Sequence, residues 1–227
     1  MTKLDDLNTE SVGSTSHSVY HALRERIVTL QLAPGEQVSD KALSQEFRVS
    51  RTPVREAILR LAEEKMVYIL PNSGTFVSPI QPDALNNAHF IRRTLECASL
   101  RESRPLSKAT QRRLRALFRE QTQAETSADP AEFYKLDDAF HRFLMEATDH
   151  AEAWLTVDRV KAQIDRVRYL AVSDGRRKGS VLEQHARIVD AVEAEDPAQT
   201  AGAMEAHLND SFAALMRTIA AYRSYIE

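Results

Sequence analysis

The residues best suited to chemistry in this chain are three histidines and one aspartate that lie on or beside apolar helix faces. Asp137 and His141, four residues apart, share the edge of the apolar stripe on a helix expected over residues 130–149. His185 falls in the middle of the stripe on a later helix, and His207 borders the stripe on the last one. Three imidazoles and one carboxylate are therefore expected to face one interior from three helices.

Ionisable groups in an apolar interior need partners, and a single cation bound to all four side chains would provide them together. Neutral imidazole is a good ligand for zinc, nickel, iron or copper, and Asp137 would complete a mainly nitrogen-donating site. From the residues alone, a divalent metal ion at this place, zinc or nickel, is one of two interpretations. The alternative is a set of separately satisfied core histidines in which Asp137 simply pairs with His141.

Arg92 is the second candidate for chemistry. It borders the apolar side of a helix expected over residues 83–103, where its guanidinium would match a carboxylate in bidentate geometry. We expect this carboxylate to belong to a small effector. A salt bridge to Glu96, four residues on, is the alternative, and His89, one turn away, is expected to line the same pocket.

These residues sit in a region with helix signals and no strand signals. Capping boxes support three helix starts: Asp129 with Glu132, Ser180 with Glu183, and Asp196 with Gln199. The expected helices cover residues 83–103, 107–127, 130–149, 151–173, 180–195 and 197–223. Residues 84–227 are therefore predicted to form an all-α bundle of about six helices.

The chain before this bundle predicts a different fold. Residues 49–57, VSRTPVREA, start a helix in which Ser50 or Thr52 can act as cap and Pro53 falls in the first turn. Arg51 and Arg55 lie off its apolar stripe or at its edge, as in helices that read DNA.

A short helix over residues 39–47 precedes this one, and a hairpin is expected over residues 67–77 around the turn 71–74. An earlier amphipathic helix ends at residues 33–35. Residues 17–78 are therefore predicted to form a winged helix-turn-helix. Together with the bundle, this makes a mainly α protein.

Composition sets the remaining expectations. The chain has 227 residues, 43% of them hydrophobic, and a net charge of −3. Residues 1–16 are expected to be a disordered tail, and residues 79–83, with two prolines, a linker. No apolar run is long enough for a membrane span, and no signal pattern begins the chain. The single cysteine, Cys97, suits a reducing compartment. We therefore expect a cytoplasmic protein with no membrane partner.

Positive charge is local. Residues 48–60 carry four arginines against Glu56 alone, although residues 17–78 hold eight Lys/Arg and seven Asp/Glu. A small basic footprint makes few phosphate contacts per subunit, so we expect more than one subunit on the DNA.

Three segments of the N-terminal region together resemble the GntR family of bacterial transcription regulators: LAPGE at 32–36, VSRTPVREA at 49–57 and NSGTFV at 72–77. The resemblance implies that Lys41, Ser50, Arg51, Thr52 and Arg55 contact operator DNA, and that the wing around Asn72 and Gly74 reaches the minor groove. One departure is visible, since Lys65 stands where the family usually has glycine.

The bundle resembles the FCD effector domain of the FadR-like GntR regulators in the segments DDAFH at 137–141, EQHARIVDA at 183–191 and AMEAHL at 203–208. The resemblance implies that Asp137, His141, His185 and His207 bind a divalent metal, and that Arg92 binds an effector. It also implies a homodimeric repressor that releases its operator when the effector binds. A metal-dependent hydrolase is the alternative, although no glutamate lies beside the ligands as in a metalloprotease helix.

Overall fold

The protein is described by a computed structural model over residues 6–173, 177–222 and 225–226. It divides into two compact units, one ending at Ile80 and the other covering Gln81–Ile226. The division falls inside the segment 79–83 that the sequence predicts as a linker. Each unit is described by itself below.

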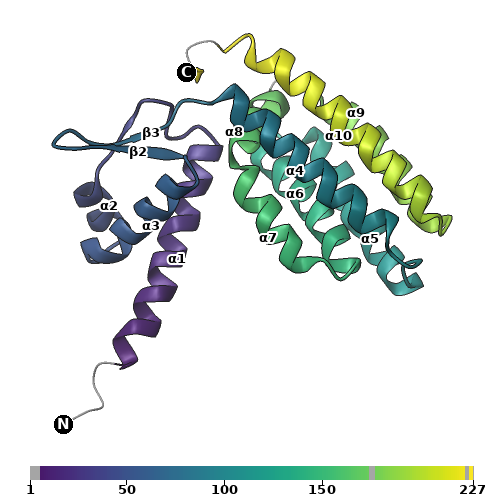
Figure 1. The fold of residues 1–227 in the computed structure, drawn as a ribbon, viewed down its shortest axis with the longest axis horizontal. Coiled ribbons are helices and arrows are strands. Elements are labelled where there is room, and N and C mark those ends of the chain that lie inside the picture. The colour runs from purple at the N-terminus through teal and green to yellow at the C-terminus, as the bar shows by residue number, and fades with distance from the viewer. Residues whose placement is uncertain (1–5, 174–176, 223–224, 227) are drawn as a thin grey trace. The chain divides into compact units, whose positions relative to one another are not determined.

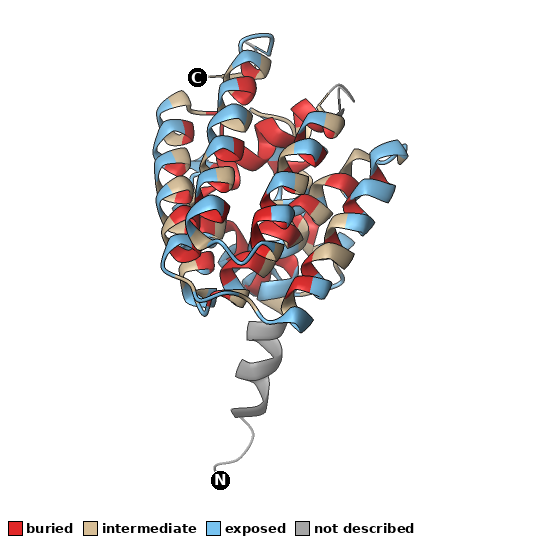
Figure 2. Ribbon diagram, turned by 90° about the vertical axis from the view of Figure 1, so that its right-hand side faces the viewer, coloured by how far each residue is buried: buried red, intermediate tan, exposed pale blue. Residues whose placement is uncertain are grey.

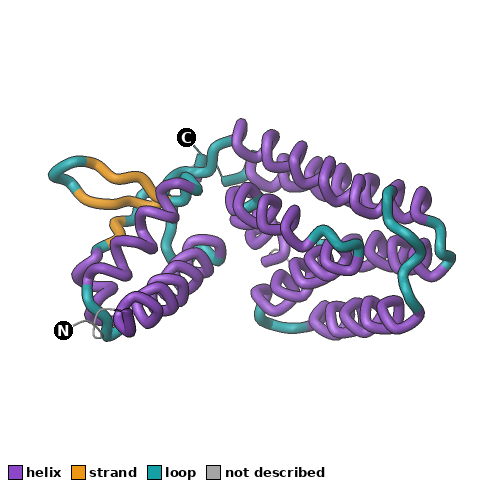
Figure 3. Tube along the Cα trace, turned by 60° about the horizontal axis from the view of Figure 1, so that its bottom comes forward, coloured by secondary structure: helices purple, strands orange, loops and turns teal. Residues whose placement is uncertain are grey.

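The first unit is a winged helix-turn-helix, as predicted. Its elements are α1 (Asp6–Val28), β1 (Gln37–Val38), α2 (Asp40–Glu46), α3 (Arg51–Glu63), β2 (Val67–Leu70) and β3 (Gly74–Val77) (Figure 1). The strands form one antiparallel sheet in the order β1-β3-β2, and Leu70 pairs with Gly74 beside the hairpin turn. Figure 3 shows these strands in orange among the helices of this unit.

α1 begins earlier than predicted. Residues 6–16, which we expected to be part of a disordered tail, belong to this helix, whereas residues 1–5 lie outside the described part of the chain. The C-terminal half of α1 is anchored by core side chains, including Leu23 and Ile27, and helix growth from an anchored turn adds one hydrogen bond per residue. A composition rich in Ser and Thr does not prevent that growth.

The helix-turn-helix is held by an apolar seam behind α3. Val54, Ala57 and Leu61 are fully buried there, which leaves the opposite face of α3 exposed. Ser39 caps α2 by accepting a hydrogen bond from the Ala42 backbone N–H, whereas Ser50 sits at the N-cap of α3 without a side-chain cap bond.

α3 ends in a left-handed residue. Lys65 has φ +57°, and the backbone N–H groups of Lys65 and Met66 donate to the carbonyl oxygens of Ala62 and Leu61. This pattern usually has glycine at the left-handed position, which explains the family's glycine at the place of Lys65. The helix end is intact in spite of that departure.

The second unit is all-α, as predicted. Its helices are α4 (Pro82–Arg101), α5 (Lys108–Gln123), α6 (Pro130–Ala147), α7 (Ala151–Val160), α8 (Ala162–Ser173), α9 (Lys178–Glu193) and α10 (Pro197–Ile219), with a short 3₁₀ turn at Ala124–Thr126. Buried residues turn inward and exposed ones outward on these helices (Figure 2). The main core joins α4, α5, α6, α9 and α10 through residues that include Leu100, Leu114, Phe140, Ile188 and Met204.

The single helix predicted for residues 151–173 is wrong, because the chain makes two helices separated at Lys161. No glycine or proline marks this break. Lys161 is fully buried, and its Nζ lies 2.7 Å from Asp138, 2.7 Å from Asp165 and 3.2 Å from Asp158. A buried ammonium needs such partners, and they come from α6, α7 and α8. Asp158 and Asp165 lie three and four residues from Lys161, whereas Asp138 of α6 is a tertiary partner that local periodicity does not reveal.

Two of the three predicted N-cap residues cap their helices, and the third does not. Asp129 and Asp196 accept hydrogen bonds from backbone N–H groups at the starts of α6 and α10, as predicted. Ser180 is not a cap, because α9 starts at Lys178 and Ser180 Oγ donates instead to the Arg177 carbonyl oxygen. Buried Lys178 donates to the carbonyl oxygens of Glu125 and Ser127, which fixes the start of α9 through a contact far away in sequence. No helix in the described part of the chain is long and apolar enough to cross a membrane.

Candidate functional site

Three histidines from three helices meet in the interior of the bundle. His141 on α6, His185 on α9 and His207 on α10 each offer a ring nitrogen, and these nitrogens lie within 4.8 Å of one another. The ring centroids are 5.2 Å apart for His141 and His185, 5.1 Å for His141 and His207, and 4.6 Å for His185 and His207. The predicted convergence of these side chains is therefore present in the structure.

Each of the three rings is held at its Nδ1 atom by an oxygen. His141 Nδ1 lies 2.7 Å from Glu96 Oε2, His185 Nδ1 lies 2.7 Å from Gln121 Oε1, and His207 Nδ1 lies 2.8 Å from Gln184 Oε1. An oxygen acceptor at Nδ1 places the proton on that nitrogen of a neutral ring. The Nε2 lone pairs are then free to bind a cation.

Burial keeps these rings neutral. It lowers the pKa of His141, and it lowers the pKa values of His185 and His207 well below the usual value, with neighbouring cationic groups acting in the same direction. The Nε2 atoms of His141 and His185 are buried and have no hydrogen-bond partner. Buried polar atoms without partners are uncommon and suggest an ion or water at that position. The donor set therefore fits a divalent transition metal.

Asp137 does not join the histidines as closely as predicted. Its Oδ1 atom lies 3.5 Å from His185 Nε2 and accepts a hydrogen bond from Gln121 Nε2 at 3.2 Å. Its other oxygen forms an ion pair with Arg168 of α8. Among the described residues, the group whose ligand atoms all lie within 4.8 Å of one another contains the three histidines without Asp137. The alternative pairing of Asp137 with His141 is not formed either, since His141 pairs with Glu96.

Arg92 forms the predicted alternative contact with Glu96 and also lines the pocket. Its Nε atom donates to Glu96 Oε1 at 2.6 Å, whereas its Nη2 atom is buried without a partner. Burial alone would raise the pKa of Glu96, but Arg92 and His141 outweigh burial and hold this pKa at about 2. Glu96 is therefore an anion that orients both Arg92 and His141.

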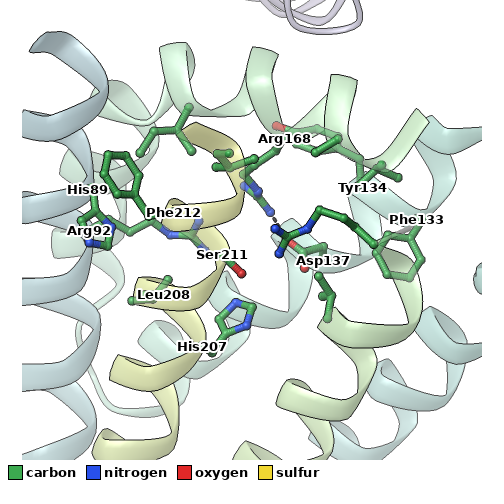
Figure 4. A pocket seen from close by; sticks show the side chains of 16 residues that line it. His89, Arg92, Phe133, Tyr134, Asp137, Arg168, His207, Leu208, Ser211 and Phe212 are labelled. Carbon is green, nitrogen blue, oxygen red and sulfur yellow. Dashed lines mark ion pairs between the residues drawn. The ribbon is translucent and has the colours of Figure 1, made fainter. Parts of the chain in front are cut away.

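A pocket opens beside the histidines, with an empty volume of about 590 Å³ that includes its mouth. Figure 4 shows Arg92 and His89 on one side of this pocket, Asp137 and Phe133 on the other, and His207 between them. His89 stacks on Phe212 at 4.1 Å and hydrogen-bonds to Asn209. The predicted effector residues Arg92 and His89 thus lie in the same pocket as His207.

Two arginines that line the pocket were not predicted as site residues from the sequence. Arg168 lines it from α8, and Arg177 lines it from the start of α9. Burial, together with the nearby charge of Arg92, lowers the pKa of Arg168 to about 9. A charged residue spaced among Ile164, Val167 and Ala171 on one helix was the signal that could have identified Arg168.

Gln121 was also missed, although the signal was similar. It is fully buried on α5, one or two turns after the core residues Leu114 and Leu117. An amide on an apolar face needs partners for both of its ends. Gln121 finds them in His185 and Asp137 and so connects two of the predicted metal ligands.

The predicted DNA-contacting residues of α2 and of the start of α3 are exposed. Ser50, Arg51, Thr52 and Arg55, at the start of α3, are all exposed. Lys41 is exposed on α2. Arg55 Nε donates to Asp40 Oδ2 at 3.0 Å, but 64% of its side chain remains exposed. The positive side chains at this helix start are therefore available to a phosphate backbone.

The wing has the geometry of a tight hairpin. Asn72 has φ +62° in its turn, and Gly74 has φ +122°. A Cβ atom at Gly74 would lie 2.7 Å from Gln37 Nε2, so the flexible Gln37 side chain would have to move, and φ +122° itself disfavours any residue with a Cβ atom. Asn72 is exposed in the turn of this hairpin.

Comparisons with known proteins match both units. A family model described as bacterial regulatory proteins, gntR family, matches residues 15–77, and a model of the FCD domain matches residues 88–210. The HTH-type transcriptional repressor RspR of Escherichia coli (strain K12) is 35% identical over 196 residues, 86% of each chain. The gluconate operon transcriptional repressor of Bacillus subtilis (strain 168) is 27% identical, over 79% of this chain and 73% of that protein.

Solved structures show the same fold. E. coli McbR/YncC has a TM-score of 0.79 at 19% identity and covers 90% of this chain and 98% of its own. A putative transcriptional regulator GntR from Rhodococcus sp. RHA1 has a TM-score of 0.77 at 22% identity, over 89% of this chain and 98% of its own. At these identities the likeness concerns the fold alone.

Proposed function

The chain belongs to the GntR family of bacterial transcription regulators, with an FCD domain after its winged helix-turn-helix, and from this premise we propose that it is a metal-dependent repressor released by a small carboxylate. The alternative of a metal-dependent hydrolase is set aside, because the matched families and relatives are transcriptional regulators and not enzymes.

The observation that carries the proposal is the state of the three imidazoles. Their Nδ1 atoms are held by Glu96, Gln121 and Gln184, and two of their buried Nε2 atoms have no partner. Partners at the far nitrogen orient metal-bound histidines and increase their basicity. His141, His185 and His207 would hold the ion, zinc or nickel, and Asp137 would join them by exchanging Arg168 for the metal.

A bound divalent cation would supply positive charge and coordination positions for an acidic ligand. The chain adds its own groups at that place. Arg92 Nη2 and Ser211 Oγ line the pocket as buried polar atoms without partners, and both can donate to a carboxylate. The remaining wall is largely apolar, with Phe133, Val172 and Leu208 among its residues. A small organic acid satisfies both kinds of surface.

DNA binding is assigned to the exposed residues of the first unit. Lys41, Ser50, Arg51, Thr52 and Arg55 would contact phosphates and base edges from α2 and α3. The wing residues Asn72 and Gly74 would approach the minor groove. The few cations on each subunit support a homodimer on two half-sites of a palindromic operator.

In a dimer, release from DNA requires that the acid bind more tightly when the two DNA-binding units, one from each subunit, are arranged unsuitably for the operator. A ligand with equal affinity for both arrangements would shift nothing. α4, which carries Arg92 and His89, is the first helix after the unit boundary at Ile80, so a ligand on these side chains acts on the helix directly joined to the DNA-binding unit. We propose that this helix transmits the signal.

The test is a gel shift on the promoter of the protein's own gene, with zinc, with a chelator and with a panel of organic acids. The proposal predicts binding by the zinc-loaded protein and release by at least one acid only when zinc is present. His185→Ala should lose zinc but still bind DNA, and Arg55→Ala should keep zinc but lose specific DNA binding. Release that is unaffected by chelation, or specific operator binding retained by Arg55→Ala, would contradict it.

A further inference from the structure

The pocket continues beyond the histidines along two neighbouring helices. On α9, Arg177 and Val181 line it and His185 follows at the same spacing of four, so the three share one helix face. On α10, His207, Ser211 and Leu215 repeat the spacing. α9 and α10 pack against each other, and a short connection makes them antiparallel. The cavity is therefore elongated, with the histidines at one end and Arg177 at the other.

The length of this cavity follows from helix geometry. Eight residues separate Arg177 from His185, which corresponds to about 12 Å along the axis of α9. The long arginine side chain covers part of this distance. A ligand with one acidic group near the histidines therefore has its other end close to the guanidinium of Arg177.

Among the described residues, Arg177 differs from the other two arginines of this pocket, because no ion pair is formed by its guanidinium. Arg168 is paired with Asp137 and Asp165, and Arg92 is paired with Glu96. Arg177 forms no ion pair or side-chain hydrogen bond with any residue that the structure describes, although it is half-buried. Burial lowers its pKa, the like charge of Arg217 acts in the same direction, and the more weakly acting carboxylate of Asp210 opposes them. An anion beside Arg177 would relieve both effects.

Arg177 also marks the mouth of the pocket. It lines a second, outer groove together with Arg217, Ser180 and Tyr222. An acidic ligand that enters from this side meets Arg217 and Arg177 before it reaches the apolar walls and the histidines. Arg177 thus lines both the outer groove and the inner pocket, which is the position of a residue that selects ligands.

We propose that the effector is a linear diacid, with one carboxylate near the histidines and Arg92 and the second carboxylate on Arg177. This inference rests on the proposed function, because it assumes that the pocket binds a carboxylate. It adds the chemical class of the ligand, a diacid, and names Arg177 as the residue that determines the preference for diacids over monoacids. Arg177 contacts the ligand directly in this account, and bidentate pairing of guanidinium with carboxylate is among the stronger polar contacts.

The test compares acids that differ only in the second carboxylate. Isothermal titration of the full-length, zinc-loaded protein is carried out with succinate against butyrate, glutarate against pentanoate, and adipate against hexanoate. The diacid of best-fitting length should bind with a Kd at least about tenfold lower than its monoacid partner. In Arg177→Met, this advantage should disappear while the affinity for the monoacid stays the same.

The control is Arg187→Met, which removes an exposed arginine from the same helix. It should keep the preference for the diacid. Unchanged zinc binding by Arg177→Met reports that this variant is folded. If monoacids and diacids bind equally well, or if Arg177→Met retains the preference, the diacid inference is wrong and the carboxylate proposal stands. If none of the acids binds to the zinc-loaded protein, both are overturned.

Discussion

Arg168 of α8 forms an ion pair with Asp137 of α6 inside the bundle, while the other oxygen of Asp137 lies 3.5 Å from His185 Nε2 (Figure 4). The carboxylate is therefore shared between an arginine and the histidine cluster. A metal ion that draws on both oxygens of Asp137 would replace Arg168 as its partner. In that case the two cations would compete for one anion, and an arginine freed by metal binding would become available to an acidic ligand.

Replacement of Arg168 by methionine should therefore strengthen metal binding. Without the guanidinium, the buried carboxylate of Asp137 has lost its cationic partner, and a buried anion without one is strongly unfavourable. We expect the Kd for zinc to fall by about tenfold, measured by titration against a chelator of known affinity.

Arg187→Met, on an exposed surface, should leave the Kd for zinc unchanged. Weaker zinc binding by Arg168→Met would mean that the arginine positions Asp137 for the metal, which contradicts competition between the two cations.

Gln121 should matter for metal affinity although it offers no ligand to the ion. Its amide oxygen holds His185 Nδ1, and its amide nitrogen donates to Asp137. Loss of such orienting partners typically weakens metal binding by about 10- to 100-fold, and we expect this range for the Kd of Gln121→Leu. Gln123→Leu, on the exposed side of the same helix, is the matched control. Equal zinc affinity of the two variants would show that Gln121 is only a packing residue.

The parts of the fold that the sequence predicted correctly are those marked by signals within a few residues of the chain. Pro130 and Pro197, each behind an aspartate cap, mark two helix starts without reference to the rest of the chain. The break at Lys161 and the start of α9 at Lys178 could not be predicted in this way. Lys161 pairs with Asp138 and Lys178 donates to the carbonyl oxygen of Glu125, both distant in sequence, and such contacts leave no mark on local periodicity.

The candidate site was predictable in its ligands but not in their partners. His141, His185 and His207 could be found because imidazoles on apolar helix faces stand out. The pairing of Asp137 with Arg168 depends on how α6 and α8 approach each other, which helix periodicity does not determine. Arg177 is the N-cap residue of α9 and lies outside the helix predicted over residues 180–195, so the predicted stripe could not assign it to the pocket.

Lys65 lowers the stability of the first unit through its backbone. It adopts φ +57° at the end of α3, a conformation that glycine takes more readily than a residue with a Cβ atom. Lys65→Gly should raise the free energy of unfolding by about 0.5–1 kcal/mol, measured by urea denaturation. Lys65→Ala retains the Cβ atom and should not gain this stability. A gain of equal size in both variants would assign the effect to the lysine side chain instead.

Cys97 should be unreactive in the folded protein. It is 4% exposed in the core of the second unit, and burial, followed by the charge of Glu96, raises the pKa of its thiol to about 12. The thiolate is the reactive form, so only on the order of one molecule in ten thousand is reactive at pH 8. A chromogenic disulfide reagent should report one thiol per chain in denaturant and almost none without it. Rapid reaction of the folded chain would place Cys97 on an accessible surface.

The central claim is that His141, His185 and His207 bind one divalent ion, and metal content after dialysis against zinc tests it most directly. The account predicts one zinc ion per chain for the unaltered protein and for His17→Ala/His21→Ala, which removes a pair of histidines in the other unit whose Nε2 atoms lie 3.0 Å apart. It predicts no retained zinc for His141→Ala/His185→Ala. An unaltered protein that holds no zinc, or a His141→Ala/His185→Ala variant that still holds one ion per chain, would contradict the account.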